Sequence, residues 1–257
     1  MQSAPSNYDA IYAEGDYDVE YKVNIDGTDY YQRSDTVDGY TKQSSYIWSL
    51  KTSRKVFSEN NPMIGCAMVG QLDLTIMNPG VTFTRRASVK PYIRIRSRNN
   101  TNRVSGWLQK GEFFIDTRPE DDTDDIDIIE IQGFDAMRKA NQKYPSSTLS
   151  WTATRPWAYE VVREIAGFIG VSVDTDTNTL LYNTRDANHV VAFPAQYTMA
   201  EVLGSIGAMY GGNFIISDIG RLKLVSLMDL PAETYYLVNE KGNYITFGGT
   251  RILLRGG

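Results

Sequence analysis

Alternating apolar and polar residues predict several short β-strands in the first half of the chain. In residues 17–25, tyrosine, valine and isoleucine occupy every second position, with charged or amide residues between them. This period of two gives a strand one apolar face and one solvated face. Asp26-Gly27 then suits the left-handed positions of a tight hairpin turn, and Tyr30-Tyr31 begins a return strand.

Further alternating runs continue as far as residue 132. We expect four more strands, over residues 71–76, 89–96, 107–116 and 126–132. Pro91 cannot donate a hydrogen bond to a β-ladder, so its strand should lie at a sheet edge or carry a bulge near its start. Several short strands separated by turn residues are typical of a β-barrel or a β-sandwich.

After residue 133 the apolar spacing becomes helical. Phe134 and Met137 predict a short helix that ends before Tyr144-Pro145. A longer helix is expected to begin near Thr154, with Pro156 in its first turn and Gly170 at its end. Its apolar stripe consists of Trp157, Val161, Ile165 and Phe168.

A third helix is predicted to begin at Thr198-Met199-Ala200-Glu201, a capping box in which the two polar side chains satisfy free backbone donors. Gly211-Gly212 should end this helix. A hairpin with its turn at Asp218-Ile219-Gly220 then follows.

These patterns divide the chain into four parts and predict a mainly β fold with an α+β insert. The polar residues 1–16 suggest a loose arm, and residues 17–133 a first β-barrel-like domain. We expect an α+β domain over 134–230. Residues 231–257 alternate again and would begin a second barrel or form C-terminal strands. Whether residues 1–60 complete the first barrel or decorate it stays open.

Composition narrows the classes of function. The 257 residues are 42% hydrophobic, enough for a sizeable core, and carry a net charge of −5. A chain with this negative net charge lacks the positive electrostatic field of a dedicated nucleic-acid-binding protein. No run approaches the ~20 apolar residues of a membrane span. The single cysteine, Cys66, allows no intrachain disulfide, fits folding in a reducing cytoplasm, and is expected in a core.

Residues with catalytic chemistry are sparse. His189 is the only histidine, and the sequence has no nucleophile elbow, phosphate-binding glycine loop or zinc-binding helix motif. We therefore predict that the chain is not an enzyme, and we assign no catalytic, cofactor-binding or metal-binding residue. The stretch Asp174-Thr175-Asp176-Thr177-Asn178 resembles the start of a calcium loop. Thr179 and Arg185 stand where its glycine and glutamate belong, so we reject that interpretation.

Two charged clusters lie close together in the sequence. Residues 116–130 form an acidic run that could recruit calcium or supply a carboxylate pair for glycoside hydrolysis. The run lacks a turn glycine and a bidentate glutamate in register, so a solvated loop is the simpler interpretation. The arginines 85, 86, 94, 96, 98 and 103 are expected on one exposed surface, either for charge-complementary docking or as an ordinary solvated face.

Short motifs between residues 65 and 137 form the most specific feature. They are Gly65-Cys66-Ala67, Gln71-Leu72-Asp73-Leu74-Thr75-Ile76, Lys90-Pro91-Tyr92-Ile93-Arg94, Gly106-Trp107-Leu108-Gln109-Lys110-Gly111-Glu112-Phe113-Phe114-Ile115-Asp116-Thr117-Arg118 and Gln132-Gly133-Phe134-Asp135-Ala136-Met137. With the later helix and hairpin they resemble the N-terminal hub region of tail-tip or baseplate-hub proteins from phages and prophages of Gram-positive hosts. The resemblance covers residues 60–257.

The resemblance implies a structural role. Such hubs have two β-barrel-like domains joined by an α+β region, and they form homotrimers with a pseudo-sixfold ring that matches the tail tube. Their other face carries a spike, fibre or lytic component. The implied location is the tail tip of a virion, and the implied partners are other copies of the chain, tail-tube or distal tail proteins, and tip or spike proteins.

Two other functions remain open. A carbohydrate- or receptor-binding module would use the aromatic residues, Trp107 among them. A cell-wall hydrolase would use acidic residues near 116–130. The host, the tail type and the flanking partners do not follow from the sequence.

Overall fold

The computed structural model describes most of the chain. The described residues are 5–32, 46–57, 63–77, 80, 82–117, 128–151, 155–185, 190, 193–226, 235–236, 246–247, 250–251 and 253–254. His189, the turn at Asn78-Pro79 and all of the acidic run except its two ends lie outside them, so the expected solvated loop of that run is not described.

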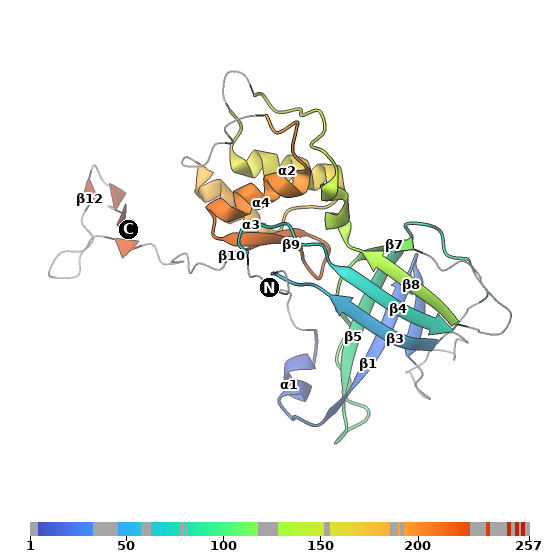
Figure 1. Cartoon of the computed structure of the whole chain (residues 1–257). Coiled ribbons are helices and arrows are strands. Elements are labelled where there is room, and N and C mark those ends of the chain that lie inside the picture. Colours follow the sequence, from blue (N-terminus) through green and yellow to red (C-terminus); the bar gives the residue numbers. More distant parts are fainter. Residues whose placement is uncertain are drawn as a thin grey trace.

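Eight strands from the first half of the chain form one antiparallel-rich sheet that closes on itself (Figure 1). The strands are β1 (Tyr17–Ile25), β2 (Thr28–Gln32), β3 (Tyr46–Ser53), β4 (Gln71–Met77), β5 (Ser88–Ser97), β6 (Leu108–Gln109), β7 (Phe113–Thr117) and β8 (Ile128–Phe134). Their order is β1-β2-β3-β4-β8-β7-β5-β6, and β5 also pairs with β1 along nine residue pairs. Seven strands therefore make a closed barrel, with β6 added to β5. The predicted mainly β fold class is confirmed.

The alternation of the sequence places the barrel core. In β4, Leu72, Leu74 and Ile76 are at most 1% exposed, and the polar residues between them face outward. Val23, Val89 and other strand residues join the same apolar cluster. The predicted hairpin is present, and Asp26 and Gly27 both have positive φ values, as a two-residue turn of this hand needs.

The first sixty residues complete the barrel, because they supply β1, β2 and β3. For residues 5–16, the described part of the predicted loose arm, that prediction is wrong. A short helix, α1 (Tyr8–Tyr12), packs on β5, and its Ile11 is fully buried. The Ser97 hydroxyl also donates a hydrogen bond to the Glu14 carboxylate at 2.6 Å.

The strand containing Pro91 was expected at a sheet edge or with a bulge near its start, and the edge position is wrong. β5 pairs with β1 on one side and with β7 and β6 on the other. The Pro91 carbonyl accepts a hydrogen bond from the Lys110 N–H at 2.8 Å. The side of Pro91 that lacks an N–H donor therefore faces residues 110–112, where no strand pairs with β5. The single strand predicted over 107–116 is interrupted at these residues and forms two strands, β6 and β7.

A helical part follows the barrel. It contains the 3₁₀ helix η1 (Ala136–Asn141), the α-helices α2 (Ala158–Ile169), α3 (Thr175–Asn183) and α4 (Met199–Met209), and the hairpin of β9 (Gly212–Ile216) and β10 (Leu222–Ser226). The helices and the hairpin enclose a second apolar core, which includes Val161, Ile165, Leu203 and Phe214. α2 and α4 lie side by side next to the hairpin (Figure 1).

Several helix boundaries were predicted and one helix was not. α4 begins with the predicted capping box, in which the Thr198 N–H donates to the Glu201 carboxylate at 2.7 Å. α2 ends at Gly170 as predicted, with φ at 83°. It begins at Ala158 rather than near Thr154, which lies outside the described residues, so Pro156 precedes the helix. The unpredicted α3 begins at Thr175 and is capped by Asp174, whose carboxylate accepts from the Asp176 N–H.

Four two-residue strands are described near the C-terminus. They are β11 (Tyr235–Tyr236), β12 (Thr246–Phe247), β13 (Thr250–Arg251) and β14 (Leu253–Leu254), paired as β11 with β14 and β12 with β13. A second barrel stays a prediction. Among the described residues, no helix has the length and apolar character to cross a membrane.

Candidate functional site at the junction of the barrel and the helical part

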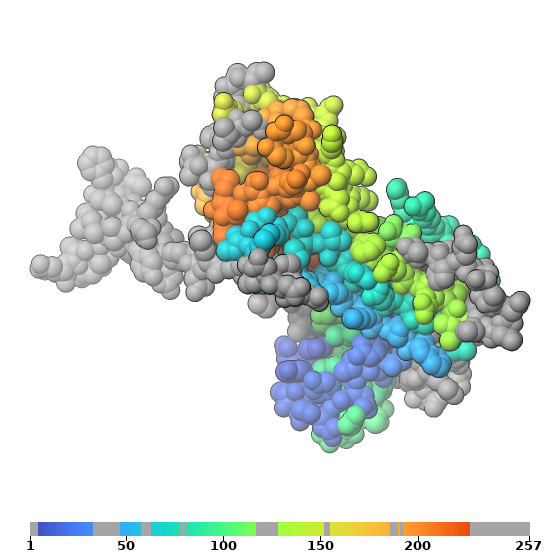
Figure 2. Space-filling model, viewed as in Figure 1, coloured from blue at the N-terminus to red at the C-terminus, as the bar shows by residue number. Residues whose placement is uncertain are grey.

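The chain passes between barrel and helical part through two neighbouring connections. One is the segment 65–70, which leads into β4, and the other is Asp135, which follows β8. Figure 2 shows the first segment, in cyan, lying against the orange helical part. The Gly65 N–H donates to the Gly212 carbonyl at 3.1 Å, and the Met68 N–H donates to the Phe214 carbonyl at 2.8 Å. The segment thus runs parallel to β9, with Ala67 opposite Phe214 in an isolated β-bridge.

Two glycines allow the segment to cross α4 closely. A Cβ atom on Gly204 would lie 2.4 Å from the Gly65 carbonyl oxygen, and a Cβ atom on Gly65 would lie 2.8 Å from the Ala208 side chain. Gly65 also has a φ of +86°, which favours glycine. A side chain at either position would push the segment away from the helix.

Asn213, in β9, binds the segment 65–70 through its side chain. Its side chain is fully buried, and its amide nitrogen donates to the carbonyls of Val56 at 2.6 Å and Met63 at 2.8 Å. Its amide oxygen accepts from the Cys66 N–H at 2.8 Å. One buried polar side chain therefore joins β9 to both ends of the stretch between β3 and the segment. Cys66, expected in a core, is half-buried.

Asp135 joins the two connections. One carboxylate oxygen accepts from the Gly70 N–H at 2.8 Å, and the other accepts from the Met137 N–H at 3.0 Å, at the start of η1. The residue is 3% exposed, and burial raises the pKa of its carboxyl group to about 7 against the opposing pull of these hydrogen bonds and of Arg54. Gly70 has no space for a side chain, because its Cβ atom would lie 2.5 Å from that carboxylate.

A third contact ties the β9–β10 turn to the barrel. Arg54, just after β3, forms an ion pair with Asp218 and donates to the Lys110 carbonyl. The Lys110 ammonium nitrogen lies 3.4 Å from a carboxylate oxygen of Asp218. These groups are partly buried, and together with Asp135 they anchor the two parts of the chain at several points.

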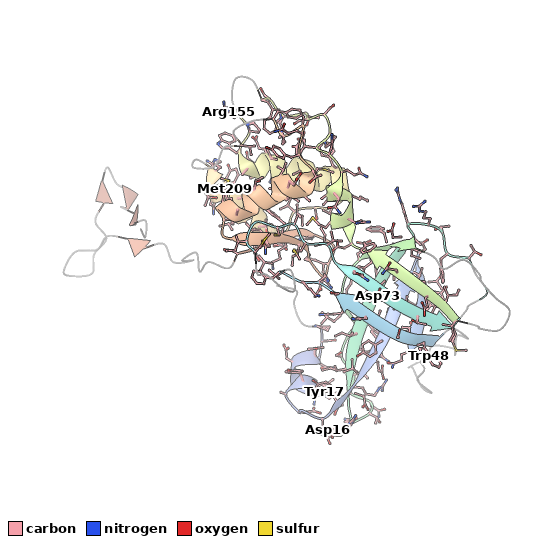
Figure 3. All side chains as sticks on the ribbon, viewed as in Figure 1. Asp16, Tyr17, Trp48, Asp73, Arg155 and Met209 are labelled. Carbon is pink, nitrogen blue, oxygen red and sulfur yellow. The ribbon has the colours of Figure 1, made fainter. Side chains whose placement is uncertain are left out.

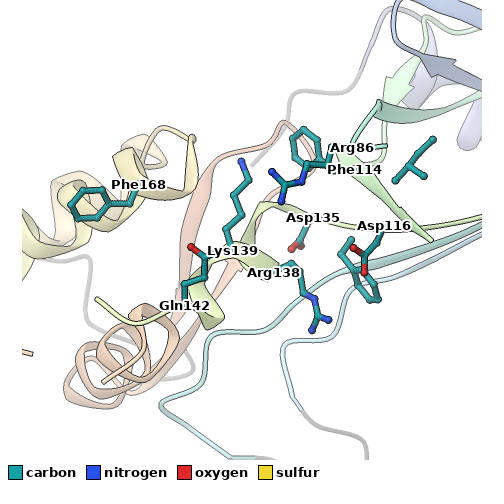
Figure 4. Close-up of a pocket in the computed structure, with 10 residues that line it drawn as sticks. Arg86, Phe114, Asp116, Asp135, Arg138, Lys139, Gln142 and Phe168 are labelled. Atoms are coloured by element: carbon teal, nitrogen blue, oxygen red, sulfur yellow. The ribbon is translucent and has the colours of Figure 1, made fainter. Parts of the chain in front are cut away.

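A cleft opens beside Asp135 (Figure 4). Its volume is about 590 Å³. It is lined by Arg86, Phe114, Ile115, Asp116, Phe134, Asp135, Arg138, Lys139, Gln142 and Phe168, so both parts of the chain contribute. The Arg138 guanidinium lies 5.1 Å from the centre of the Phe134 ring, and the Lys139 ammonium lies 5.2 Å from that of Phe114. Lys139 also donates to the Ile169 carbonyl at 3.1 Å, at the end of α2.

The predicted exposed surface is wrong for Arg94, which is buried, whereas Arg98 is exposed as expected. Arg94 is 6% exposed, and it and Arg96 both bind the Glu20 carboxylate, at 2.5 and 2.7 Å. Arg98 pairs with two aspartates of residues 16–18, and Arg103 pairs with Glu14. Acidic residues that precede or begin β1 thus neutralise four of the six arginines, while Arg85 and Arg86 are exposed.

Trp107 does not present a free ring for sugar stacking. The Arg94 guanidinium lies 4.6 Å from its ring centre and the Lys22 ammonium 5.2 Å. Of the acidic run, Asp116 and Glu130 have described side chains. Among the described residues, no three histidine, cysteine or acidic side chains are placed to hold a metal ion. The rejected calcium loop is the N-terminus of α3.

Sequence reasoning missed Arg54, Asn213 and Asp218 as residues of the junction. An asparagine inside the apolar run of β9 was a signal, because a buried amide needs hydrogen-bond partners. Gly65 and Asp135 belonged to the quoted motifs, but no role was assigned to them.

Comparisons with known proteins assign no family to the chain. No protein-family model matches it, and no curated protein matches its sequence. Among solved structures, it is similar to the 43 kDa tail protein of prophage MuSo2 from Shewanella oneidensis, at 12% identity and a TM-score of 0.49. The similarity covers 85% of this chain and 59% of that tail protein, so the chain spans less than two thirds of that protein's length.

Proposed function

We propose that the chain is a structural protein of a phage tail or a tail-derived particle, and that it acts as the hub of the tail tip or baseplate. The proposal is carried by the motifs that resemble tail hubs. Three residues of the stretch they span, Gly65, Gly70 and Asp135, lie at the junction of barrel and helical part, where the Gly65 N–H donates to the Gly212 carbonyl and the Gly70 N–H to the Asp135 carboxylate. The same stretch supplies β4, β5, β7 and β8 of the closed barrel. A barrel joined to an α+β part is the architecture that the resemblance implies.

In this role the chain would connect the tail tube to a distal spike, fibre or lytic component, as a homotrimer in the virion. Exposed apolar residues beside the junction support contacts with other subunits. Met63 and Ile64 are 51% and 47% exposed and directly precede Gly65. Met209, 53% exposed, follows Ala208, whose side chain a Cβ atom on Gly65 would meet at 2.8 Å. Figure 3 labels Met209 on the helical part and the exposed Trp48 on the barrel.

The molar mass in solution, measured by light scattering, tests this assignment. We expect three times the 28.9 kDa mass of one chain. The substitutions Ile64→Asp and Met209→Asp should shift the protein towards monomers, because a charge in a buried contact is costly. Asn99→Asp, in the exposed loop after β5, is the control for the added charge and should leave the mass unchanged. A monomer at every concentration would contradict the hub assignment.

A carbohydrate-binding function makes a different prediction. Because cations already lie over the Trp107 ring, a glycan would stack on the exposed Trp48 instead. Glycan-array binding that is lost in Trp48→Ala and kept in Trp107→Ala would favour this function over the hub. A cell-wall hydrolase would produce clearing on a peptidoglycan zymogram, and we expect none.

A further inference from the structure

The cleft beside Asp135 holds positive charge that the fold does not neutralise. Arg86, Arg138 and Lys139 all line it. Within the part of the chain that the structure describes, neither Arg86 nor Arg138 forms an ion pair, in contrast to the four paired arginines between residues 94 and 103. The chain as a whole is acidic, with a net charge of −5. Three cationic side chains therefore gather in one hollow of an acidic chain.

Arg86 holds its position at the expense of backbone strain. Its φ is +68°, in the left-handed region that favours glycine. The backbone there is fixed by the barrel, because the Arg86 N–H donates to the Ile115 carbonyl at 3.0 Å. A glycine would adopt this turn without strain. The turn instead carries an arginine whose side chain lines the cleft.

The negative groups of the cleft do not cancel this charge. The Asp135 carboxylate is buried and already accepts hydrogen bonds from Gly70 and Met137. Asp116 is exposed, and no ion pair joins it to a described residue of the cleft. Phe114, Phe134 and Phe168 supply apolar surface between the cations. The hollow thus combines positive charge with aromatic walls.

We propose that this cleft is a docking site for an acidic peptide segment of a partner protein. Carboxylates of the segment would pair with Arg86 and Arg138, and an apolar side chain would lie against Phe114 and Phe168. Charge complementarity favours a peptide over nucleic acid, since three cations on an acidic chain are few for a phosphate backbone. The identification of the partner as a tail protein rests on the proposed function, because a hub holds other proteins. The binding of an acidic peptide does not depend on that function.

Fluorescence anisotropy with the full chain tests the site directly. The probe is a labelled synthetic peptide of glutamates with interspersed leucines, at low salt. Arg86→Glu combined with Arg138→Glu should weaken binding about tenfold or more, because it brings like charges together. Arg85→Glu is the matched control, since Arg85 is also exposed but does not line the cleft. It should change affinity less than about threefold.

Arg86→Gly separates binding from folding. It removes the guanidinium and relieves the strained backbone, so binding should weaken while the melting temperature stays unchanged or rises by a few degrees. A neutral peptide with glutamines should bind weakly, and millimolar inorganic phosphate should compete no better than chloride of equal ionic strength.

Three results would overturn the proposal: no binding by the wild-type chain at low salt, equal loss in Arg85→Glu, or full displacement by phosphate, which would indicate a small-anion site. A peptide of residues 116–130 that binds while the unrelated peptide does not would identify the chain's own acidic run as the occupant and exclude a separate partner. A monomeric chain that still binds the acidic peptide would contradict the hub and leave the docking site in place.

Discussion

The close crossing of the segment 65–70 over α4 makes a quantitative prediction for Gly204→Ala. Alanine normally stabilises the interior of a helix by about 1 kcal/mol relative to glycine. At this position the new Cβ atom would lie 2.4 Å from the Gly65 carbonyl oxygen and 3.2 Å from its carbonyl carbon. Both atoms belong to the backbone, so no side-chain rotation relieves the clash. The segment would have to move by about 1 Å against the hydrogen bonds that Gly65 and Cys66 make to the hairpin.

Such overpacking costs roughly 1–3 kcal/mol, and strained hydrogen bonds add to it, so we expect a net loss of about 1–2 kcal/mol in Gly204→Ala. The matched control is Gly167→Ala in α2, where a Cβ atom would meet nothing within 4 Å. That variant should gain up to about 1 kcal/mol. Urea unfolding followed by circular dichroism measures both. A stabilising effect of Gly204→Ala equal to that of Gly167→Ala would refute the crossing, because it requires open space at both glycines.

Three further predictions concern the junction and the helix caps. The raised pKa of Asp135, about 7 against a usual value of 3.8, means that its contribution to stability is full below pH 4 and is lost as the pH rises through 7. The unfolding free energy of the wild type relative to Asp135→Asn should thus fall by up to ~4 kcal/mol from pH 4 to pH 8; a flat difference would contradict the buried, destabilised carboxylate. Asn213→Ala removes three hydrogen bonds and leaves buried groups unpaired, which should cost about 2–4 kcal/mol by urea unfolding; a loss under about 0.5 kcal/mol would contradict its role. Thr198→Ala removes the cap of α4 and should cost about 1 kcal/mol, whereas Ser205→Ala, on the exposed face of the same helix, should be nearly neutral in the same assay.

Features that neighbouring residues determine could be predicted from the sequence. The hairpin turn at Asp26-Gly27, the capping box at Thr198 and the end of α2 at Gly170 each depend on a few adjacent residues. Two elements, β3 and α3, could not be predicted from the pattern of neighbouring residues. β3 breaks its alternation at a register shift between Ile47 and Ser49, and α3 is largely polar, with Thr177 and Leu181 as its buried residues.

Contacts between residues distant in the sequence could not be predicted. Barrel closure depends on the pairing of Tyr17 with Ser97 and of the residues that follow, and no local pattern encodes that register. The arginines of β5 appeared to form an exposed surface because their partner, Glu20, lies more than seventy residues away. The junction is built in the same way, since Asn213 and Asp135 bind backbone groups far from them in the chain.

Electron microscopy of the purified chain tests the proposed hub most directly. We expect particles whose class averages show threefold symmetry around a central channel, with the barrels arranged in a ring. Compact, asymmetric particles of single-chain size at micromolar concentration would contradict it.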